Sequence, residues 1–120
     1  MASFVIAVAT APYLAQSATT AFLFAQTVVA KQHDLIQVFF YNSGCLTAHP
    51  KLESDLAALA LFQGWQALAE KSKTALRVCS SACVRYGLYP VSLPQPFQAA
   101  GSSQFVQALM EVDRYVSFGH

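Results

Sequence analysis

Charged side chains are scarce in this sequence of 120 residues. It contains seven Lys and Arg and six Asp and Glu, which gives a net charge of +1, whereas about a quarter of a typical soluble domain is charged. So few basic residues cannot form the positive stripe that follows a nucleic-acid backbone, so direct nucleic-acid binding is not expected. A small domain has a large surface, so apolar side chains must cover part of it. We therefore expect an oligomer.

The first 30 residues contain no charged side chain. A membrane-spanning helix needs roughly 20 predominantly apolar residues, and Thr10, Pro12 and Gln16 interrupt this run too early. A signal peptide begins with basic residues, and no Lys or Arg precedes the apolar stretch from Phe4 to Val8. The sequence therefore predicts neither a membrane span nor export, and we expect a cytoplasmic protein.

Cysteine is also rare, and Cys45, Cys79 and Cys83 are an odd number. A small disulfide-bonded scaffold usually has an even number, so this count favours a reducing compartment with free thiols. Apolar residues, by contrast, make up 55% of the chain, which excludes intrinsic disorder. The length, without repeats or linkers, predicts one domain over residues 1–120.

Strand-like and helix-like segments alternate along the chain. Leu35 to Tyr41 is typical of a strand buried on both faces, and apolar residues at helical spacing begin near Ser17, a candidate N-cap. This alternation predicts a three-layer α/β/α fold with a mainly parallel sheet of about five strands. The expected strands are Ser3 to Val8, Leu35 to Tyr41, Thr74 to Val78, a short one near Phe97, and Tyr115 to Phe118. The expected helices are one from Ser17 with apolar positions up to Val29, one from Ser54 to about Lys71, one from Ser80 to Tyr86 closed by Gly87, and one from Ser102 or Ser103 carrying Phe105, Leu109 and Val112.

The predicted helix from Ser54 to Lys71 is apolar nearly all round. One side carries Ala58, Leu61, Trp65 and Leu68, and the other carries Leu56, Leu59 and Phe62. Such a helix is buried on both sides. In a chain this short, we expect another subunit to provide the second cover.

Cys79 follows a predicted strand and precedes a predicted helix. In a parallel α/β sheet, ligands and reactive groups collect at the carboxyl ends of the strands. The start of a helix also favours a thiolate, which is the nucleophilic form of cysteine. A buried, unreactive cysteine in such a turn is equally common, so the position alone leaves both interpretations open.

The run CSSACVR places Arg85 six residues after Cys79, which is the C-x5-R spacing of cysteine-dependent phosphatases. Such a phosphate loop normally needs glycines, and this run has none, so a solvated Arg85 is the preferred interpretation. Cys83 lies one helical turn after Cys79, which does not match the C-x-x-C pair of redox proteins. We expect Cys83 to be a core residue.

Four potential zinc ligands follow the second and third predicted strands. They are Cys45 and His49, at C-x3-H spacing, and Cys79 and Cys83, at C-x3-C spacing. Structural zinc sites prefer tighter knuckles, and a helical Cys83 would point away from such a site, so we predict no metal. His33 and His120 are expected to be solvated.

An ordered series of residues extends over nearly the whole chain and includes a V-F-F-Y run at Val38 to Tyr41 and V-C at Val78 and Cys79. Its other members are Tyr13, Gln16, Ala18, Ala21, Phe22, Phe24, Ala25, Gln26, His33, Gly44, Trp65, Gln66, Leu68, Arg85, Gly87, Asp113, Arg114, Val116 and Phe118. This ordered set resembles the DsrE/TusD family of sulfur-relay proteins.

The resemblance implies that Cys79 carries sulfur as a persulfide, without a metal or organic cofactor. It implies assembly with two related subunits, typically as a heterohexamer, together with a small upstream sulfur donor and a downstream acceptor that ends in a cysteine-bearing tail. The relayed sulfur would serve 2-thiolation of tRNA uridine or sulfur oxidation. Arg85, Tyr13 and Gln16 become candidates for shaping the site. The remaining alternatives are a non-catalytic structural subunit and a phosphatase-like hydrolase.

The chain also departs from the family pattern. Leu14 stands where glycine is usual, and Cys45 where an aliphatic residue is usual. In the segment CSSACVRYG, Ser81 and Cys83 replace alanines and Tyr86 replaces an arginine. These departures concern the choice of carrier more than Cys79, and we expect Cys45 and Cys83 to be accessory thiols at most.

Overall fold

The computed structural model describes residues 2–12, 16–48, 56–88 and 93–119, so the predictions on Tyr13, His49, Ser54 and His120 lie outside the described residues. Within these ranges, five parallel strands form one sheet in the order β4-β3-β2-β1-β5. The strands are β1 (Ser3–Val8), β2 (Asp34–Phe40), β3 (Ala75–Cys79), β4 (Phe97–Ala100) and β5 (Arg114–Phe118). The helices are α1 (Gln16–Ala30), the 3-10 helix η1 (Asn42–Ala48), α2 (Leu56–Ser72), α3 (Ser80–Arg85) and α4 (Ser102–Met110).

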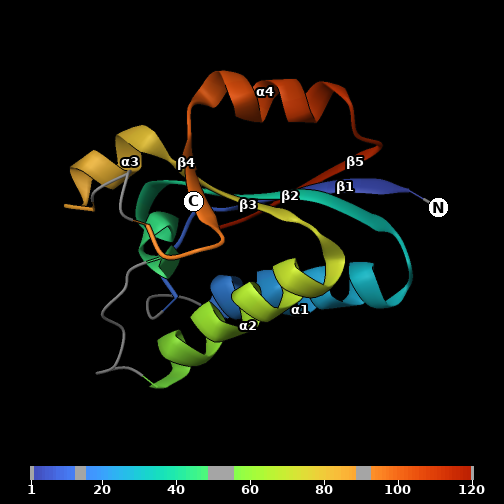
Figure 1. The fold of residues 1–120 in the computed structure, drawn as a ribbon, viewed down its shortest axis with the longest axis horizontal. Helices are drawn as coiled ribbons and strands as arrows, with labels where there is room; N and C mark the ends of the chain where they lie inside the picture. The colour runs from blue at the N-terminus through green and yellow to red at the C-terminus, as the bar shows by residue number, and fades with distance from the viewer. Residues whose placement is uncertain (1, 13–15, 49–55, 89–92, 120) are drawn as a thin grey trace.

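Helices lie on both faces of this sheet. Figure 1 shows α1 and α2 side by side against one face and α4 across the other. α3 follows β3 without an intervening residue, so it begins where the strands end. The predicted three-layer α/β/α fold with a parallel sheet is confirmed.

Most predicted boundaries lie within one residue of the observed ones. The N-cap assigned to Ser17 is wrong, because α1 begins at Gln16 and the Ser17 hydroxyl instead lies 2.9 Å from the hydroxyl of Thr10. The Ser17 hydroxyl thus contacts Thr10, which follows β1, instead of capping the helix. Val112 lies beyond the end of α4. Gly87 has a φ of 77°, as its predicted place after a helix requires.

The core lies between the sheet and the pair α1 and α2. The ring of Trp65 is at its centre, 5.0 Å from the ring of Phe22 and 5.4 Å from that of Phe40, both in edge-on contact. The predicted apolar faces of both helices are confirmed, since their main positions are buried. These positions are Ala18, Ala21, Ala25 and Val28 of α1 and Ala58, Leu61, Trp65 and Leu68 of α2.

The other side of α2 is covered in part by the chain itself. Phe62 stacks on Phe97 of β4, with ring centroids 5.6 Å apart and an interplanar angle of 9°. β4 thus covers part of Phe62 within the chain itself, and a second subunit over the surface of α2 that remains exposed stays a prediction. Leu59 is half-buried, whereas Leu56 keeps 79% of its surface exposed.

His33 is not the solvated side chain that the sequence predicts. It is half-buried, and its Nδ1 atom accepts a hydrogen bond of 3.0 Å from the main-chain nitrogen of Ala2. Its ring also contacts that of Phe4, with centroids 5.5 Å apart. The residue therefore helps to hold the start of the chain against the turn that precedes β2.

The sheet face under α4 has a thinner cover. α4 connects β4 at one edge of the sheet with β5 at the opposite edge, and none of its nine residues is buried. Phe105 provides its main aromatic contacts: its ring stacks on Phe39 of β2 at 4.3 Å and meets Tyr115 of β5 at 5.8 Å. This single layer leaves space between α4 and the ends of the strands.

Candidate functional site

Cys79 is the last residue of β3, and the next residue begins α3. It pairs in register with Ala100 of β4, so it lies at the carboxyl end of the sheet, as the sequence predicts. The inward side chains Leu76 and Val78 of β3 alternate with it and are buried, whereas Cys79 is only partly buried. The thiol therefore faces the α4 side of the sheet.

A cavity of about 330 Å³ opens beside Cys79. Its lining residues come from the end of β2, the residue after it and the start of η1, from the end of β3, from α3, from the start and middle of α4, and from β5. They are Phe39, Tyr41, Asn42, Cys79, Ser81, Ala82, Arg85, Ser102, Phe105 and Tyr115. Four of these carry aromatic rings, one is cationic and none of those described is acidic. The cavity can thus receive an apolar or anionic group next to the sulfur of Cys79.

The surroundings of Tyr115 raise the pKa of its phenol. Burial raises the pKa of Tyr115, the nearby Tyr41 raises it further, and a hydrogen bond with Ser117 opposes the change. The hydroxyl of Tyr115 therefore stays protonated well above neutral pH. Both tyrosines line the cavity beside Cys79.

Cys45 lies outside this cavity. It belongs to η1 and has no exposed surface, and its Sγ donates a long hydrogen bond of 3.7 Å to the main-chain oxygen of Ala82. Burial, reinforced by Cys83 and Cys79, raises the pKa of the Cys45 thiol to about 12. Cys45 is thus a protonated core thiol at neutral pH.

Cys83 is likewise a core residue, as the sequence predicts. It is fully buried in α3, and burial is the main cause that raises the pKa of its thiol, with Cys79 adding to the effect. A thiolate is the reactive form of cysteine, so neither buried thiol is suited to attack a substrate.

The other predicted site residues are only partly brought together. Arg85 is exposed and lines the Cys79 cavity. Gln16 is the exposed first residue of α1 and is not among the lining residues. Tyr13 lies outside the described residues. Of the proposed shaping residues, Arg85 is thus the one that the described structure places at Cys79.

The aromatic lining was not anticipated from the sequence. Phe39 and Tyr41 alternate with the core residue Phe40 along and just beyond β2, and this spacing of two is the signal that places them on the opposite face. The sequence predicts Phe105 on an apolar helix face and Tyr115 in a strand. Only the crossing of α4 over the sheet brings them to Cys79.

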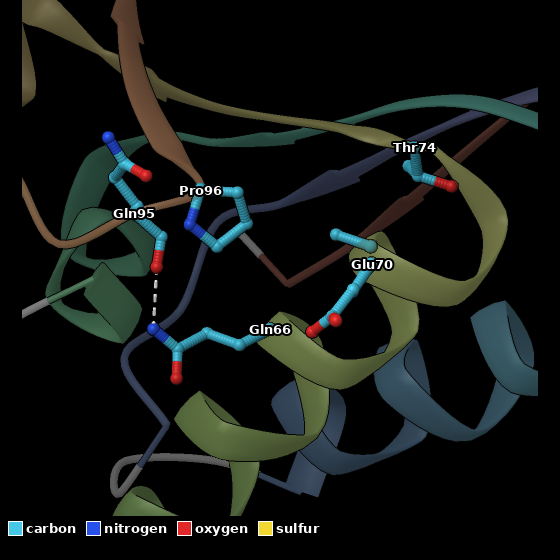
Figure 2. A pocket seen from close by; sticks show the side chains of 6 residues that line it. Gln66, Glu70, Thr74, Gln95 and Pro96 are labelled. Carbon is cyan, nitrogen blue, oxygen red and sulfur yellow. Dashed lines mark hydrogen bonds between the residues drawn. The ribbon is translucent and has the colours of Figure 1, made fainter.

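A second cavity, of about 450 Å³, lies between α2 and the segment before β4. Figure 2 shows Gln66 reaching from α2 to Gln95, where its Nε2 donates a hydrogen bond of 2.6 Å to the main-chain oxygen. Ala69, Glu70, Thr74 and Pro96 complete the lining. The cavity has no thiol, so it does not share the chemistry of the Cys79 cavity.

The described part of the chain contains neither a group of metal ligands nor a membrane-spanning helix. Within residues 2–12, 16–48, 56–88 and 93–119, no three His, Cys, Asp or Glu side chains are grouped as metal ligands. His49, one of the four ligands considered for zinc, is outside these ranges. None of the described helices is long and apolar enough to cross a membrane.

Comparison with known proteins places the chain in a family. The model of the DsrE/DsrF-like family matches residues 2–118. The chain belongs to the DsrE/DsrF-like family. A protein of Vibrio cholerae named sulfurtransferase TusD homolog is 36% identical, covering 88% of this chain and 89% of its own. The sulfurtransferase TusD proteins of Buchnera aphidicola and Pectobacterium atrosepticum are each 31% identical over nearly the full length, with 97% and 98% of this chain covered and 99% and 100% of theirs.

Solved structures support the same fold. The ychN protein of E. coli superposes with a TM-score of 0.81 at 15% identity, covering 98% of this chain and 100% of that one. MTH1491 of Methanobacterium thermoautotrophicum, a protein of unknown function, gives a TM-score of 0.66 at 15% identity, with coverage of 98% and 99%. At this identity the likeness concerns the DsrE-like fold alone.

Proposed function

We propose that this protein is a sulfurtransferase of the relay type, in which Cys79 receives sulfur as a persulfide and passes it to an acceptor protein. The observation that carries this proposal is the contrast among the three cysteines: Cys79 lines a cavity, whereas Cys45 and Cys83 are fully buried. The naming of the relatives as sulfurtransferase TusD supports sulfur transfer as the activity.

The proposed chemistry is balanced without an external oxidant or reductant. The Cys79 thiolate attacks the outer sulfur of a donor persulfide, a bond forms between Sγ and that sulfur, and the donor S–S bond breaks. The inner sulfur of the donor leaves as a thiolate with the bonding electron pair. An acceptor thiolate then attacks the outer sulfur on Cys79 in the same way, and Cys79 leaves as a thiolate.

The cavity supplies two physical contributions to this exchange. Arg85 offers the positive charge in the described lining, which attracts an anionic sulfur species. The rings of Phe39 and Phe105 keep one wall apolar, which limits the access of water to the exchanging sulfur. No metal or organic cofactor is part of the proposed steps.

The relay also requires partners. We propose assembly with two related subunits, a small persulfide donor upstream and an acceptor protein downstream with a cysteine near its end, serving tRNA 2-thiolation or sulfur oxidation. Exposed apolar side chains at Leu56, Val84 and Met110, which are 79%, 72% and 82% exposed, fit a chain that meets other subunits.

Intact mass after incubation with inorganic polysulfide tests the proposal. We expect the wild type to gain one sulfur atom that dithiothreitol removes, and the Cys79→Ser variant to gain none. The Cys45→Ala variant is the matched control, because it removes a buried thiol and leaves Cys79 in place. Reducible sulfur on Cys79→Ser would move the carrier role to another cysteine.

The alternatives predict other results, in the intact-mass assay or in a phosphatase assay. A non-catalytic structural subunit would leave the folded wild type without added sulfur. A phosphatase would hydrolyse p-nitrophenyl phosphate and lose that activity in Cys79→Ser. Residues 80–85 form a helix rather than an open glycine-rich loop, which favours the relay over the phosphatase.

A further inference from the structure

We propose that Tyr41, Phe105 and Tyr115 form a recognition wall, and that this wall selects a peptide carrier whose persulfidated cysteine has apolar neighbours. The inference rests on the proposed function and adds the chemistry of the substrate. The wall is defined by these three residues, which come from the end of β2, from α4 and from β5.

Aromatic contacts hold the wall together. Phe39 links its members, because its ring lies 4.3 Å from Phe105 and 6.1 Å from Tyr41, stacked on both. Phe105 then meets Tyr115 edge-on at 5.8 Å. The rings are therefore already ordered before a ligand arrives, and an ordered wall loses little conformational freedom on binding.

The wall is open to a ligand on one side. Tyr115 keeps 47% of its surface exposed although it lines the cavity beside Cys79, whereas Phe39, which stacks on Phe105, is 4% exposed. Aromatic rings that remain accessible in this way are typical anchors for apolar groups of a partner. A ligand that covers Tyr115 would bury its ring and bring its own sulfur near Cys79.

The charge and the volume of the cavity limit the class of ligand that it can bind. The described lining contains Arg85 and no carboxylate, so a basic segment would meet repulsion without a compensating partner. The volume of about 330 Å³ lies at the lower end of the range for small-ligand sites. It therefore suits a cysteine with one or two neighbouring side chains rather than a folded surface.

Three synthetic peptides of equal length test the proposal. Each carries one cysteine persulfide, flanked by Leu and Phe in the first, by Ser in the second and by Lys in the third. The measurement is the rate at which each peptide loads sulfur on Cys79, followed by intact mass. We expect the apolar peptide to load roughly tenfold faster than the lysine peptide, with the serine peptide between them.

Variants connect this preference to the wall. In Tyr115→Ala we expect the ratio of the apolar to the lysine rate to fall by about threefold or more, since a ring contact is lost. Tyr115→Phe keeps the ring and should keep the ratio. Val106→Ala is the matched control, because Val106 is 51% exposed on α4 but is not among the lining residues. If Tyr115→Ala does not fold, Tyr41→Leu replaces it.

The outcomes separate this inference from the proposed function. Wild type that does not accept sulfur from inorganic polysulfide would overturn the relay itself. Wild type that accepts polysulfide sulfur but loads all three peptides at equal rates would overturn only the recognition wall. A preference that persists unchanged in both Tyr115→Ala and Tyr41→Leu would also overturn it.

Discussion

The Sγ atom of Cys45 lies 3.7 Å from the main-chain oxygen of Ala82, so the 3-10 helix after β2 contacts the helix that follows Cys79. Cys45 is fully buried, and Ala82 lines the Cys79 cavity. The contact therefore joins the core to a wall of the candidate site. The same oxygen also accepts a hydrogen bond of 2.9 Å from the main-chain nitrogen of Tyr86, so the turn of α3 has a second support.

Replacing Cys45 by Ala should affect stability more than sulfur transfer. A thiol is a weak hydrogen-bond donor, and removing a buried sulfur leaves a small cavity that costs about 1–2 kcal/mol of unfolding free energy. We expect Cys79 to load sulfur at a rate within about tenfold of the wild type. Urea denaturation and intact mass measure the two effects.

A matched control for this variant is Val84→Ala. Val84 lies in α3 but is 72% exposed, so its truncation should change neither stability nor loading appreciably. If folded Cys45→Ala protein loaded sulfur several orders of magnitude more slowly, Cys45 would be a second relay thiol rather than a packing residue.

The buried thiols predict a decline of stability at alkaline pH. The pKa of Cys45 is raised from 9.0 to about 12 in the folded protein, and that of Cys83 is raised as well. The contribution of these thiols to the free energy of unfolding is complete below the thiol pKa of the unfolded chain. It falls as pH rises from that value toward the higher pKa of the folded protein, because the unfolded chain releases these protons first. One such thiol accounts for at most about 1.4 kcal/mol per pH unit.

Urea unfolding at about pH 8 and about pH 10 tests this coupling. Other groups titrate in the same window, so the informative quantity is the difference in slope between the wild type and Cys45→Ala. We expect the variant to lose less unfolding free energy between the two conditions. Equal losses would mean that Cys45 titrates normally in the folded state.

Local patterns predicted the parts of the fold that depend on local spacing. The buried face of α2 follows from apolar residues three and four positions apart, and the position of Cys79 follows from the end of an apolar run. Each of these patterns is formed by residues within about one helical turn or one strand of the residues whose structure it predicts. The candidate nucleophile could therefore be placed at the carboxyl end of the sheet from the sequence.

Contacts between distant segments could not be predicted in this way. Phe62 and Phe97 stack although 34 residues separate them, and periodicity within α2 cannot indicate which strand returns beside it. η1 has no clear period, and its Gly44 and Cys45 are buried by contacts with β1 and α3. The aromatic lining of the cavity depends likewise on how α4 crosses the sheet.

Gly44 is required by a close approach between two main-chain segments. A Cβ atom at this position would overlap the main-chain oxygen of Val8 and lie 2.9 Å from its carbonyl carbon. We expect Gly44→Ala to lower the unfolding free energy by about 2 kcal/mol or more, because a main-chain neighbour cannot rotate away. Gly101→Ala is the control, since the nearest side-chain atom to its added Cβ is 4.0 Å away. Thermal denaturation measures the stability of both variants, and equal stability would contradict the close approach.

Arg85 should accelerate the loading of anionic sulfur donors without being essential. Its guanidinium is exposed at the rim of the Cys79 cavity, where solvent screens its field, so we expect Arg85→Ala to slow loading by inorganic polysulfide by roughly two- to fivefold. Added salt should slow the wild type and affect Arg85→Ala less, because the screened attraction is already absent there. Arg114→Ala is the matched control, since Arg114 is exposed at the start of β5 and is not among the lining residues. An identical salt dependence in all three proteins would show that Arg85 does not act on the donor. A loading rate that is lower by several orders of magnitude in Arg85→Ala would instead show that Arg85 is obligatory for the exchange.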